Sequence, residues 1–375
     1  MRTKKFFSRR KAAWALFFLG AAAVIAWNPG AGSAPDGDGS EPPPAPEAPA
    51  PAEPDLPPTI WDRMVYPTDQ QHLLEPGRDG VYQPTAAGEL ESALYGSVRT
   101  SRQGGRLLPS FHKGIDIAAV SRDRRNRPRD SIYAVVDGII TYVNRTAGNS
   151  SYGLYLVLLH DDPIGPVYTL YAHLASFADG VREGRRVAAG EILGVMGNTA
   201  GGYRIPLARA HLHFEIGLVF NSRFARWARS RKIRNDHKNY NGWNLMPIDP
   251  LEFFRAGAAS PRLDFSNHLQ SIPVAFEAVV RVEKLPDFFR RYPSLWEGPR
   301  MGKGAITIAC CQYGIPLRGR AADPEETRLL GEERIRITAV DREVLGRNGR
   351  GVISPRGGGW GLGRNGANWL ALLTY

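Results

Sequence analysis

The chain has 375 residues, which is enough for two folded domains and a tail. Lysine and arginine outnumber aspartate and glutamate by 48 to 37, and the net charge of +11 favours an anionic partner. The two cysteines, Cys310 and Cys311, are adjacent, and neighbouring side chains of a strand point to opposite faces. This argues against a mutual disulfide and against a cysteine-ligated zinc site, so the folded part must rely on its hydrophobic core.

The first 27 residues have the layout of an export signal. Residues 1–11 are basic, and residues 12–27 form an unbroken apolar run. A charged start followed by an apolar stretch is typical of a secretory signal, whereas a membrane span needs about 20 apolar residues. The sequence therefore predicts export to the periplasm or cell envelope. It leaves open whether the segment is cleaved or kept as an anchor in the inner membrane.

Two less regular segments follow the predicted signal. Residues 28–60 are a linker rich in proline and alanine. Such a composition offers too little apolar surface to fold, and proline favours an extended, semi-stiff spacer. Residues 61–94 form an entry segment with short, irregular elements, and their sequence indicates no function.

Residues 95–256 carry short runs of β-branched residues separated by turn residues. Asp137-Gly138 stands between two of these runs, and this dipeptide is typical of a two-residue hairpin turn. The expected strands are 132–136, 139–143, 154–160 and 167–173. Because no long helical period separates them, we predict an all-β fold with an antiparallel sheet rather than βαβ units.

The strand predicted at 210–216 concentrates polar side chains on one face. His211, His213 and Glu215 alternate there with leucine, phenylalanine and isoleucine, which can anchor the other face in a core. Two residues of strand separate the imidazoles by about 7 Å. Glu215 can either accept a hydrogen bond that orients an imidazole or remain a solvated carboxylate.

Two upstream stretches supply further candidate ligands. His112 and Asp116 are four residues apart, and the strand predicted at 167–173 ends in His173, on the face that also carries Tyr171. Each pattern alone is weak, because a His-x-His strand or a lone His–Asp pair is more often structural. Together, imidazoles and a carboxylate on separate strands can converge on one cation, and Zn²⁺ accepts these ligands when no thiolate is present.

These stretches resemble the lysostaphin-type (LytM-type) zinc endopeptidases, which cut peptidoglycan peptides. The matching motifs are H-x-G-x-D-I-A at 112–118, L-Y-x-H-L at 170–174 and H-L-H-F-E-I at 211–216, with a glycine-arginine entry at 95–99 and turn-rich hairpins at 181–197. The resemblance covers roughly residues 95–254, with the motifs in the family's order. It implies the family's antiparallel β-sheet domain, which is similar to the duplicated hybrid motif.

The resemblance also implies roles for five residues. His112, Asp116 and His213 would bind one Zn²⁺, with water completing its shell. His173 and His211 would lie beside that water, steer its proton and stabilise the oxyanion. Zinc lowers the pKa of its bound water towards 7, and a nearby histidine can carry protons at neutral pH. Unlike the helix-borne His-Glu-x-x-His peptidases, this sequence places no glutamate as a general base.

Two basic inserts, residues 121–130 and 217–246, depart from the family's pattern. Both flank the predicted cleft, where they would attract the carboxylate-bearing stems of peptidoglycan. The side chains expected to bind substrate are Arg99, Tyr171, Arg223 and Arg226. Nucleic acid is the competing polyanion, but no recognised nucleic-acid-binding module accompanies the arginines, so we expect no nucleic-acid partner.

Residues 263–375 are predicted to form a second, smaller β-rich domain. The expected strands are 272–282, 305–311 and 334–340, with hairpin turns at Asn348-Gly349 and Asn365-Gly366. The glycine-rich run at 357–361 lacks the strand-then-helix setting of a phosphate loop and is predicted to be a loop. A packing partner, a wall-binding module and a protein-docking domain are all open roles for this domain.

The sequence as a whole predicts an exported zinc metalloendopeptidase that hydrolyses peptide bonds of peptidoglycan stems or cross-links. One alternative is a non-catalytic LytM-type regulator that binds and activates another cell-wall hydrolase. Another is a passive wall-binding protein that has kept its zinc. The bond that is cut and the oligomeric state stay open.

Overall fold

The computed structural model describes residues 58–375, apart from residues 87, 104–105, 261 and 347–349. Of residues 98–109 only the backbone is described. The predicted signal segment and nearly all of the predicted linker lie outside the described residues. Within the described part, no helix is both long enough and apolar enough to cross a membrane.

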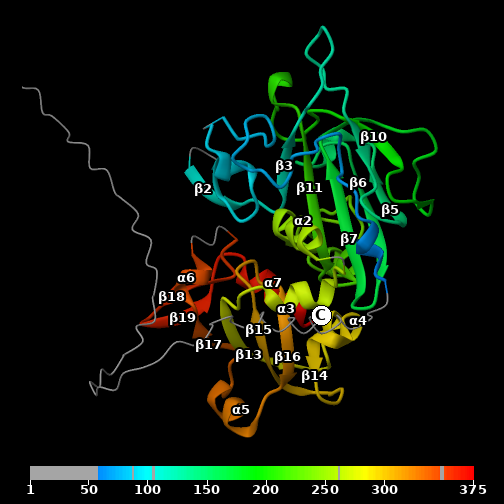
Figure 1. Cartoon of the computed structure of the whole chain (residues 1–375). Coiled ribbons are helices and arrows are strands. Elements are labelled where there is room, and N and C mark those ends of the chain that lie inside the picture. The colour runs from blue at the N-terminus through cyan, green and yellow to red at the C-terminus, as the bar shows by residue number, and fades with distance from the viewer. Residues whose placement is uncertain (1–57, 87, 104–105, 261, 347–349) are drawn as a thin grey trace, which may run out of the picture. The chain divides into compact units, whose positions relative to one another are not determined.

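A seven-stranded sheet forms the centre of the region 95–256. Its order is β12 (Leu245–Ile248), β11 (His211–Val219), β7 (Gly165–Ala172), β6 (Tyr155–Asp162), β5 (Gly138–Asn144) and β9 (Arg186–Val187), and β3 (Ile115–Ala118) also pairs with β11 (Figure 1). Every pairing in this sheet is antiparallel. The structure therefore confirms the predicted class, in which antiparallel sheets dominate and helices are few.

Strand register brings the predicted site residues together. His213 of β11 lies opposite Asp116 of β3 on one side and opposite Ala172 of β7 on the other. His112 comes shortly before β3, and His173 directly follows β7. Hydrogen bonding between strands thus places four residues from three distant segments within one short stretch of the sheet.

Smaller elements surround this sheet. β4 (Ser131–Tyr133), β10 (Ile192–Met196) and β8 (Leu174–Phe177) form a three-stranded sheet, and β1 (Val98–Gln103) pairs with β2 (Arg106–Phe111). Three short 3₁₀-helices, η1 (Ile60–Arg63), η2 (Leu90–Ala93) and η3 (Ala147–Asn149), precede β6, and η4 (Leu207–Arg209) leads into β11. Two helices follow β11, namely α1 (Phe224–Ser230) and, after β12, α2 (Pro250–Ala259).

The hairpin predicted around Asp137-Gly138 is wrong. The strand before it, β4, pairs with β10 in the small sheet, whereas the strand after it, β5, pairs with β6 and β9 in the large one. The glycine is needed for a different reason: a Cβ at Gly138 would lie 2.6 Å from Nδ1 of His160. That Nδ1 donates to the carbonyl oxygen of Asp137 at 2.8 Å. The dipeptide marks a close approach between two chain segments rather than a turn.

The apolar face of β11 anchors the strand in the core. Leu212, Phe214 and Ile216 are at most 1 % exposed. The ring of Phe214 packs between Tyr171 of β7 and Phe254 of α2, with centroid distances of 5.4 and 5.8 Å. Full burial of such side chains stabilises a fold by roughly 1.5–3 kcal/mol each. This anchoring holds the opposite, polar face of the strand in a defined position.

Residues 263–375, called the C-terminal part below, contain a second sheet. Its order is β14 (Trp296–Glu297), β16 (Pro316–Ala321), β15 (Gly304–Cys310), β13 (Phe276–Val282) and β17 (Ile335–Val340), and β18 (Ile353–Arg356) forms a hairpin with β19 (Gly359–Leu362). The helices are α3 (Phe265–Ser271), α4 (Asp287–Arg291), η5 (Pro293–Leu295), α5 (Pro324–Leu330), α6 (Arg342–Leu345) and α7 (Gly366–Leu373). The strands predicted in this part are present as β13, β15 and β17, and its being a domain of its own stays a prediction.

Two details of that prediction need correction or stay open. Asn365-Gly366 is not a hairpin turn, because Gly366 begins α7 and a Cβ there would lie 2.3 Å from the carbonyl oxygen of Val352. The other predicted turn, Asn348-Gly349, lies outside the described residues. The glycine-rich run supplies the turn and one strand of the β18–β19 hairpin.

Hydrogen bonds attach the C-terminal part to the end of β11. The buried hydroxyl of Tyr292 accepts from the backbone nitrogen of Val219 at 3.0 Å and donates to the carbonyl oxygen of Pro166 at 2.9 Å. Nearby, the carboxylate of Asp287 accepts from the backbone nitrogen of Ser222 at 2.7 Å. The described residues from 58 onward accordingly belong to one compact unit.

Candidate metal centre

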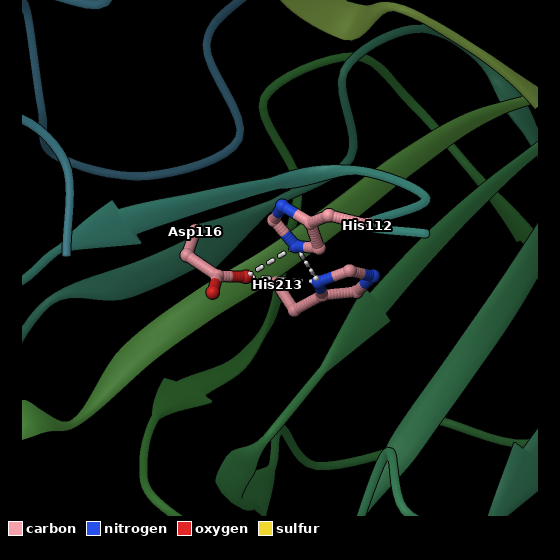
Figure 2. Close-up of side chains that lie close together, drawn as sticks. All are labelled: His112, Asp116 and His213. Atoms are coloured by element: carbon pink, nitrogen blue, oxygen red, sulfur yellow. Dashed lines mark hydrogen bonds and ion pairs between the residues drawn. The ribbon is translucent and has the colours of Figure 1, made fainter. Parts of the chain in front are cut away.

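Three donor atoms converge on one point beside β11. Nε2 of His112 lies 3.1 Å from Oδ1 of Asp116 and 3.1 Å from Nδ1 of His213, and the last two atoms are 2.9 Å apart (Figure 2). All three side chains are buried. Zinc–ligand bonds of 2.0–2.1 Å in a tetrahedron separate neighbouring ligand atoms by about 3.3 Å. The triangle is therefore close to the size that one zinc ion requires, and a potential metal site exists here.

The outer nitrogen of each histidine in this triangle is held by an oxygen. Nδ1 of His112 lies 2.8 Å from the carbonyl oxygen of Leu94, and Nε2 of His213 lies 3.0 Å from Oε1 of Glu215. A carbonyl or carboxylate oxygen can only accept, so these nitrogens carry the protons. The nitrogens that face the triangle then carry lone pairs, which is the tautomer that a metal needs.

Glu215 accepts several hydrogen bonds in a buried network next to His213. It is fully buried, and its carboxylate accepts from the hydroxyls of Tyr152 at 2.5 Å and Tyr168 at 2.9 Å. Burial alone would raise its pKa, but the charge of Lys113, 3.8 Å away, and the hydrogen bond from His213 hold the pKa at about 2. Glu215 is thus an ionised acceptor that orients His213, and the alternative of a solvated carboxylate is wrong.

His173 reaches the site because its backbone leaves the strand conformation. Its φ angle is +63°, in the left-handed region that non-glycine residues seldom occupy. The ring therefore does not follow the face of Tyr171 but lies 4.9 Å from that of His211 and 6.0 Å from that of His213. Nδ1 of His173 donates to the carbonyl oxygen of Thr199 at 2.8 Å. Burial, reinforced by His211 and His213, lowers the pKa of His173 well below its usual value.

Tyr171, predicted to bind substrate, lies instead in the core. Its side chain is fully buried, and its hydroxyl accepts hydrogen bonds from the backbone nitrogen of Val135 at 3.0 Å and from Oγ1 of Thr169 at 3.2 Å. The prediction assumed that Tyr171 and His173 share a strand face. The left-handed turn after β7 separates them.

His211 completes the group. Its Nδ1 donates to the carbonyl oxygen of Arg209 at 2.8 Å, and its Nε2 lies 3.6 Å from Oδ2 of Asp116. His173 and His211 therefore share one arrangement, in which Nδ1 is held by a backbone carbonyl and the ring stands beside the triangle of donor atoms. Neither ring belongs to that triangle.

The insert 121–130 supports the backbone that leads into His211. The guanidinium of Arg122 donates to the carbonyl oxygens of Leu207 at 2.9 Å, Ala208 at 3.3 Å and Ala210 at 3.2 Å. A bridge between Arg122 and Pro128 closes the insert on itself. At least one arginine of this insert thus has a structural role that its charge pattern did not indicate.

Residues 110–223 match the model of peptidase family M23. The matched segment, called the M23 segment below, contains all five residues of the group, and the match confirms the resemblance that the motifs indicate. A comparison with curated protein sequences found no match.

Three solved structures are among those similar to this chain. A zinc-containing peptidase from Vibrio cholerae is 22% identical, with 45% of this chain and 38% of that chain covered and a TM-score of 0.26. The catalytic domain of lysostaphin from Staphylococcus simulans is 20% identical, with coverages of 43% and 89% and a TM-score of 0.28. Csd3 from Helicobacter pylori is 20% identical, with coverages of 50% and 32% and a TM-score of 0.26. The chain thus spans about two fifths of the length of the Vibrio peptidase.

The other predicted substrate-binding residues have different positions. The side chain of Arg99 is outside the described side chains. Arg223, at the end of the M23 segment, donates to the backbone oxygen of Tyr375 at 2.6 Å and lies 5.3 Å from the centre of its ring. This contact holds the guanidinium against the C-terminal part, so Arg223 is a packing residue rather than a substrate ligand. Arg226 is exposed on α1.

The remaining buried histidines have structural partners. His160 bonds to Asp137 through Nδ1 and to Oγ1 of Thr169 through Nε2, each at 2.8 Å, and burial lowers its pKa to about 4. These contacts give His160 a structural role. His237 bonds to the hydroxyl of Tyr142 at 2.9 Å and to the carbonyl oxygen of Asn149 at 3.1 Å. Nothing in the polar sequence around His237 indicated that burial.

A cleft of about 1030 Å³ opens over the group of five residues. All five line it, as do Trp227, His237 and Trp243 from the insert 217–246. The cleft also takes side chains from the C-terminal part, among them Tyr313, Arg350 and Arg364. Both cysteines are buried free thiols outside the cleft lining.

Proposed function

We propose that this chain is a zinc metalloendopeptidase that hydrolyses peptide bonds in the stems or cross-links of peptidoglycan. One observation carries the proposal: two imidazole nitrogens and a carboxylate oxygen lie within 3.1 Å of one another. The other nitrogen of each imidazole donates a hydrogen bond to an oxygen, which fixes the tautomer that binds a metal. The M23 match over the same residues supports it.

The donor set fits a catalytic zinc ion. His112, Asp116 and His213 would hold the metal through Nε2, Oδ1 and Nδ1, and a set of three protein ligands leaves a position open, as catalytic zinc sites do. When bound, zinc lowers the pKa of a water molecule and polarises a carbonyl group. The hydrogen bond from His213 to Glu215 would keep the ring oriented and raise its basicity.

His173 and His211 are suited to move protons beside such a metal. Each holds its Nδ1 proton on a backbone carbonyl, so each has Nε2 to accept a proton from the attacking water and to return it to the leaving amine. The depressed pKa of His173 keeps its ring neutral, and so able to accept, at neutral pH. The protonated ring of either residue can then donate to the oxyanion or to the amine.

The alternative is a regulator that binds another wall hydrolase through the same fold. It requires neither His173 nor His211 in the arrangement found here. Substitutions can therefore distinguish zinc binding from zinc-dependent hydrolysis. Replacing His112, Asp116 or His213 by alanine should lower zinc content and hydrolysis together, because each removes a protein ligand.

His173→Ala and His211→Ala should keep zinc near one per chain while hydrolysis falls by about 10²–10⁴-fold, the usual contribution of general acid–base catalysis. Zinc is measured by elemental analysis, and hydrolysis by mass spectrometry of the products released from purified sacculi. His72→Ala, at an exposed histidine paired with Glu75, is the matched control and should change neither quantity. Full activity of the His173 and His211 variants would favour the regulator.

We also propose that the folded part acts outside the cytoplasm, which the basic start and apolar run of residues 1–27 support. Protease added to spheroplasts with an intact inner membrane should then digest the folded part. N-terminal sequencing of the mature protein would distinguish cleavage of the segment from retention as an anchor. Complete protection from the protease would contradict the proposed location.

A further inference from the structure

The C-terminal part supplies one wall of the cleft that contains the candidate metal centre. Tyr313, Arg350 and Arg364 line the same cleft as His112, His173 and His211. They lie at least 90 residues beyond the end of the M23 segment. The sequence left the role of the C-terminal part open. The structure places three of its side chains in the cleft of the proposed reaction.

Arg350 is positioned by a stack of rings that leads to the metal centre. Its guanidinium lies 4.0 Å from the centre of the Tyr313 ring, and that ring packs against Phe111 at 5.0 Å. Phe111 directly precedes His112. The Tyr313 ring thus holds the plane of the Arg350 guanidinium, one of whose nitrogens also lies 3.5 Å from Sδ of Met246.

Arg364 is positioned by a glycine. Gly351 has a φ angle of +62°, and a Cβ at this residue would lie 3.0 Å from Cγ and 3.3 Å from Nε of Arg364. The backbone nitrogen of Asn365 donates to the carbonyl oxygen of Gly351 at 3.0 Å, which keeps the two segments together. The stem of Arg364 therefore lies across the backbone at Gly351, and this exposed residue belongs to the cleft lining.

The charged side chains that line the cleft are mainly cationic. They are Lys113, Arg209, Arg350 and Arg364 against Glu89 and Asp116. Lys113 already lies 3.8 Å from the carboxylate of Glu215, and Asp116 belongs to the triangle of donor atoms. The buried Nε of Arg209 has no hydrogen-bond partner within the described residues. The three arginines thus face a cleft with an excess of positive charge, and a bound metal would add to it.

We propose that Arg209, Arg350 and Arg364 form a carboxylate-binding subsite through which the C-terminal part recognises an acidic group of the peptide substrate. The guanidinium fork matches a carboxylate in two parallel hydrogen bonds, and such charge-assisted bonds are about twice as strong as neutral ones. The inference rests on the proposed peptidase function and deepens it, because it makes a free carboxylate near the cut bond a condition for tight binding. It also gives the C-terminal part a role in substrate choice.

The test compares charged and neutralised substrate with matched arginine variants of the full chain. The probes are disaccharide-peptide fragments of peptidoglycan, used as free acids and after conversion of their carboxylates to amides. Arg364→Gln is the first variant, because replacing an exposed side chain changes stability little. Arg350→Gln and Arg350→Lys follow, and Arg342→Gln is the matched control, an exposed arginine of α6 outside the cleft lining.

The unaltered chain should bind the acid about tenfold more tightly than the amide, as expected for one charge-assisted hydrogen bond. Arg364→Gln should bind both forms with the same weak affinity, and Arg350→Lys should retain part of the preference. Binding is measured by calorimetry on a His211→Ala background, so that the fragments are not consumed. Arg342→Gln should behave as the unaltered chain. Equal loss for acid and amide in Arg364→Gln, or an unchanged preference, would overturn the subsite.

The same measurements separate this inference from the proposed function. Hydrolysis of sacculi by the unaltered zinc-loaded chain, with no difference between acid and amide, would leave the peptidase proposal standing and refute the subsite. A preference for the acid that Arg364→Gln abolishes, without hydrolysis by the unaltered chain, would support the subsite and refute the peptidase proposal. In the expected case, KM for the acid rises about tenfold in Arg364→Gln while kcat changes little.

Discussion

Two central strands of this protein, β11 and β15, differ in what they bury. Each is paired on both sides within its sheet. All nine residues of β11 are buried, and His211, His213 and Glu215 among them are titratable. β15 buries alanine, isoleucine, cysteine and one threonine, Thr307.

The polar side chains buried on β11 make burial of this strand more costly in free energy than burial of β15. A buried polar group is unfavourable unless a hydrogen bond compensates it. On β11 the compensation comes from backbone carbonyls and tyrosine hydroxyls of other segments, such as Arg209 for His211 and Tyr168 for Glu215. β15 needs little such support. We infer that β11 carries the candidate site and depends on its surroundings, whereas β15 mainly contributes stability.

The largest expected effect tests the role of β15. Ile308 is fully buried between β13 and β16, and Ile308→Ala should lower the free energy of unfolding by about 2–5 kcal/mol, through lost burial and the cavity left behind. Zinc content at saturating metal should not change. The measurements are urea denaturation and elemental analysis. Loss of zinc in the folded variant would show that the two sheets do not have separate roles.

The next effect concerns pH and a buried histidine of the seven-stranded sheet. The pKa of His160 is about 4 in the folded chain, because burial disfavours its charged form, and about 6.5 in the unfolded chain. As the pH falls below 6.5 the unfolded chain takes up the proton first. This group should therefore cost the fold up to about 3 kcal/mol by pH 4, and nothing above pH 7.

His160→Gln, which keeps a donor and an acceptor, should remove that part of the pH dependence. The check is the difference between the unfolding free energies of the unaltered and variant chains, measured by urea denaturation from pH 7.5 to pH 4. A difference that does not change with pH would show that folding does not lower the pKa of His160.

A smaller effect should follow from Glu215→Gln. The amide keeps an acceptor for His213 but loses the charge, and loss of such a supporting group typically weakens metal binding 10–100-fold. Competition with a chromophoric chelator measures zinc affinity. Glu277→Gln on β13 is the matched control, because this partly exposed glutamate pairs with Arg318 in the other sheet and should leave zinc affinity unchanged. Equal affinities in the two variants would remove the distinction between the strands.

The smallest effect is expected at the surface. Arg226 and Arg229 are exposed on α1, and their replacement by serine should weaken binding to sacculi a few-fold at low salt and hardly at all at high salt, where exposed charges are screened. Stability and zinc content should stay as they are. Binding that is insensitive to both changes and to ionic strength would leave α1 as a solvated surface.

The sequence by itself determined those features that depend on local periodicity. Alternation along a strand correctly placed His211, His213 and Glu215 on one face of β11, because that strand is regular over its whole length. The pairing of β6 with β7 was predictable for the same reason, since the two strands are joined by a short turn. The order of the motifs was sufficient to indicate the M23 family.

Tertiary structure alone decided the features that depend on chain segments far apart. His173 reaches the site because its own backbone adopts the left-handed conformation. Gly138 leaves room for the ring of His160 and is not part of a hairpin turn. A periodic pattern of residues shows neither of these features. Arg223 contacts Tyr375, which is 152 residues away in the sequence. Arg350 stacks on the ring of Tyr313 and lines the same cleft as His112. Such contacts are set by how the two sheets pack. Packing energy depends on the shape and burial of both partners, which no single segment of the sequence contains.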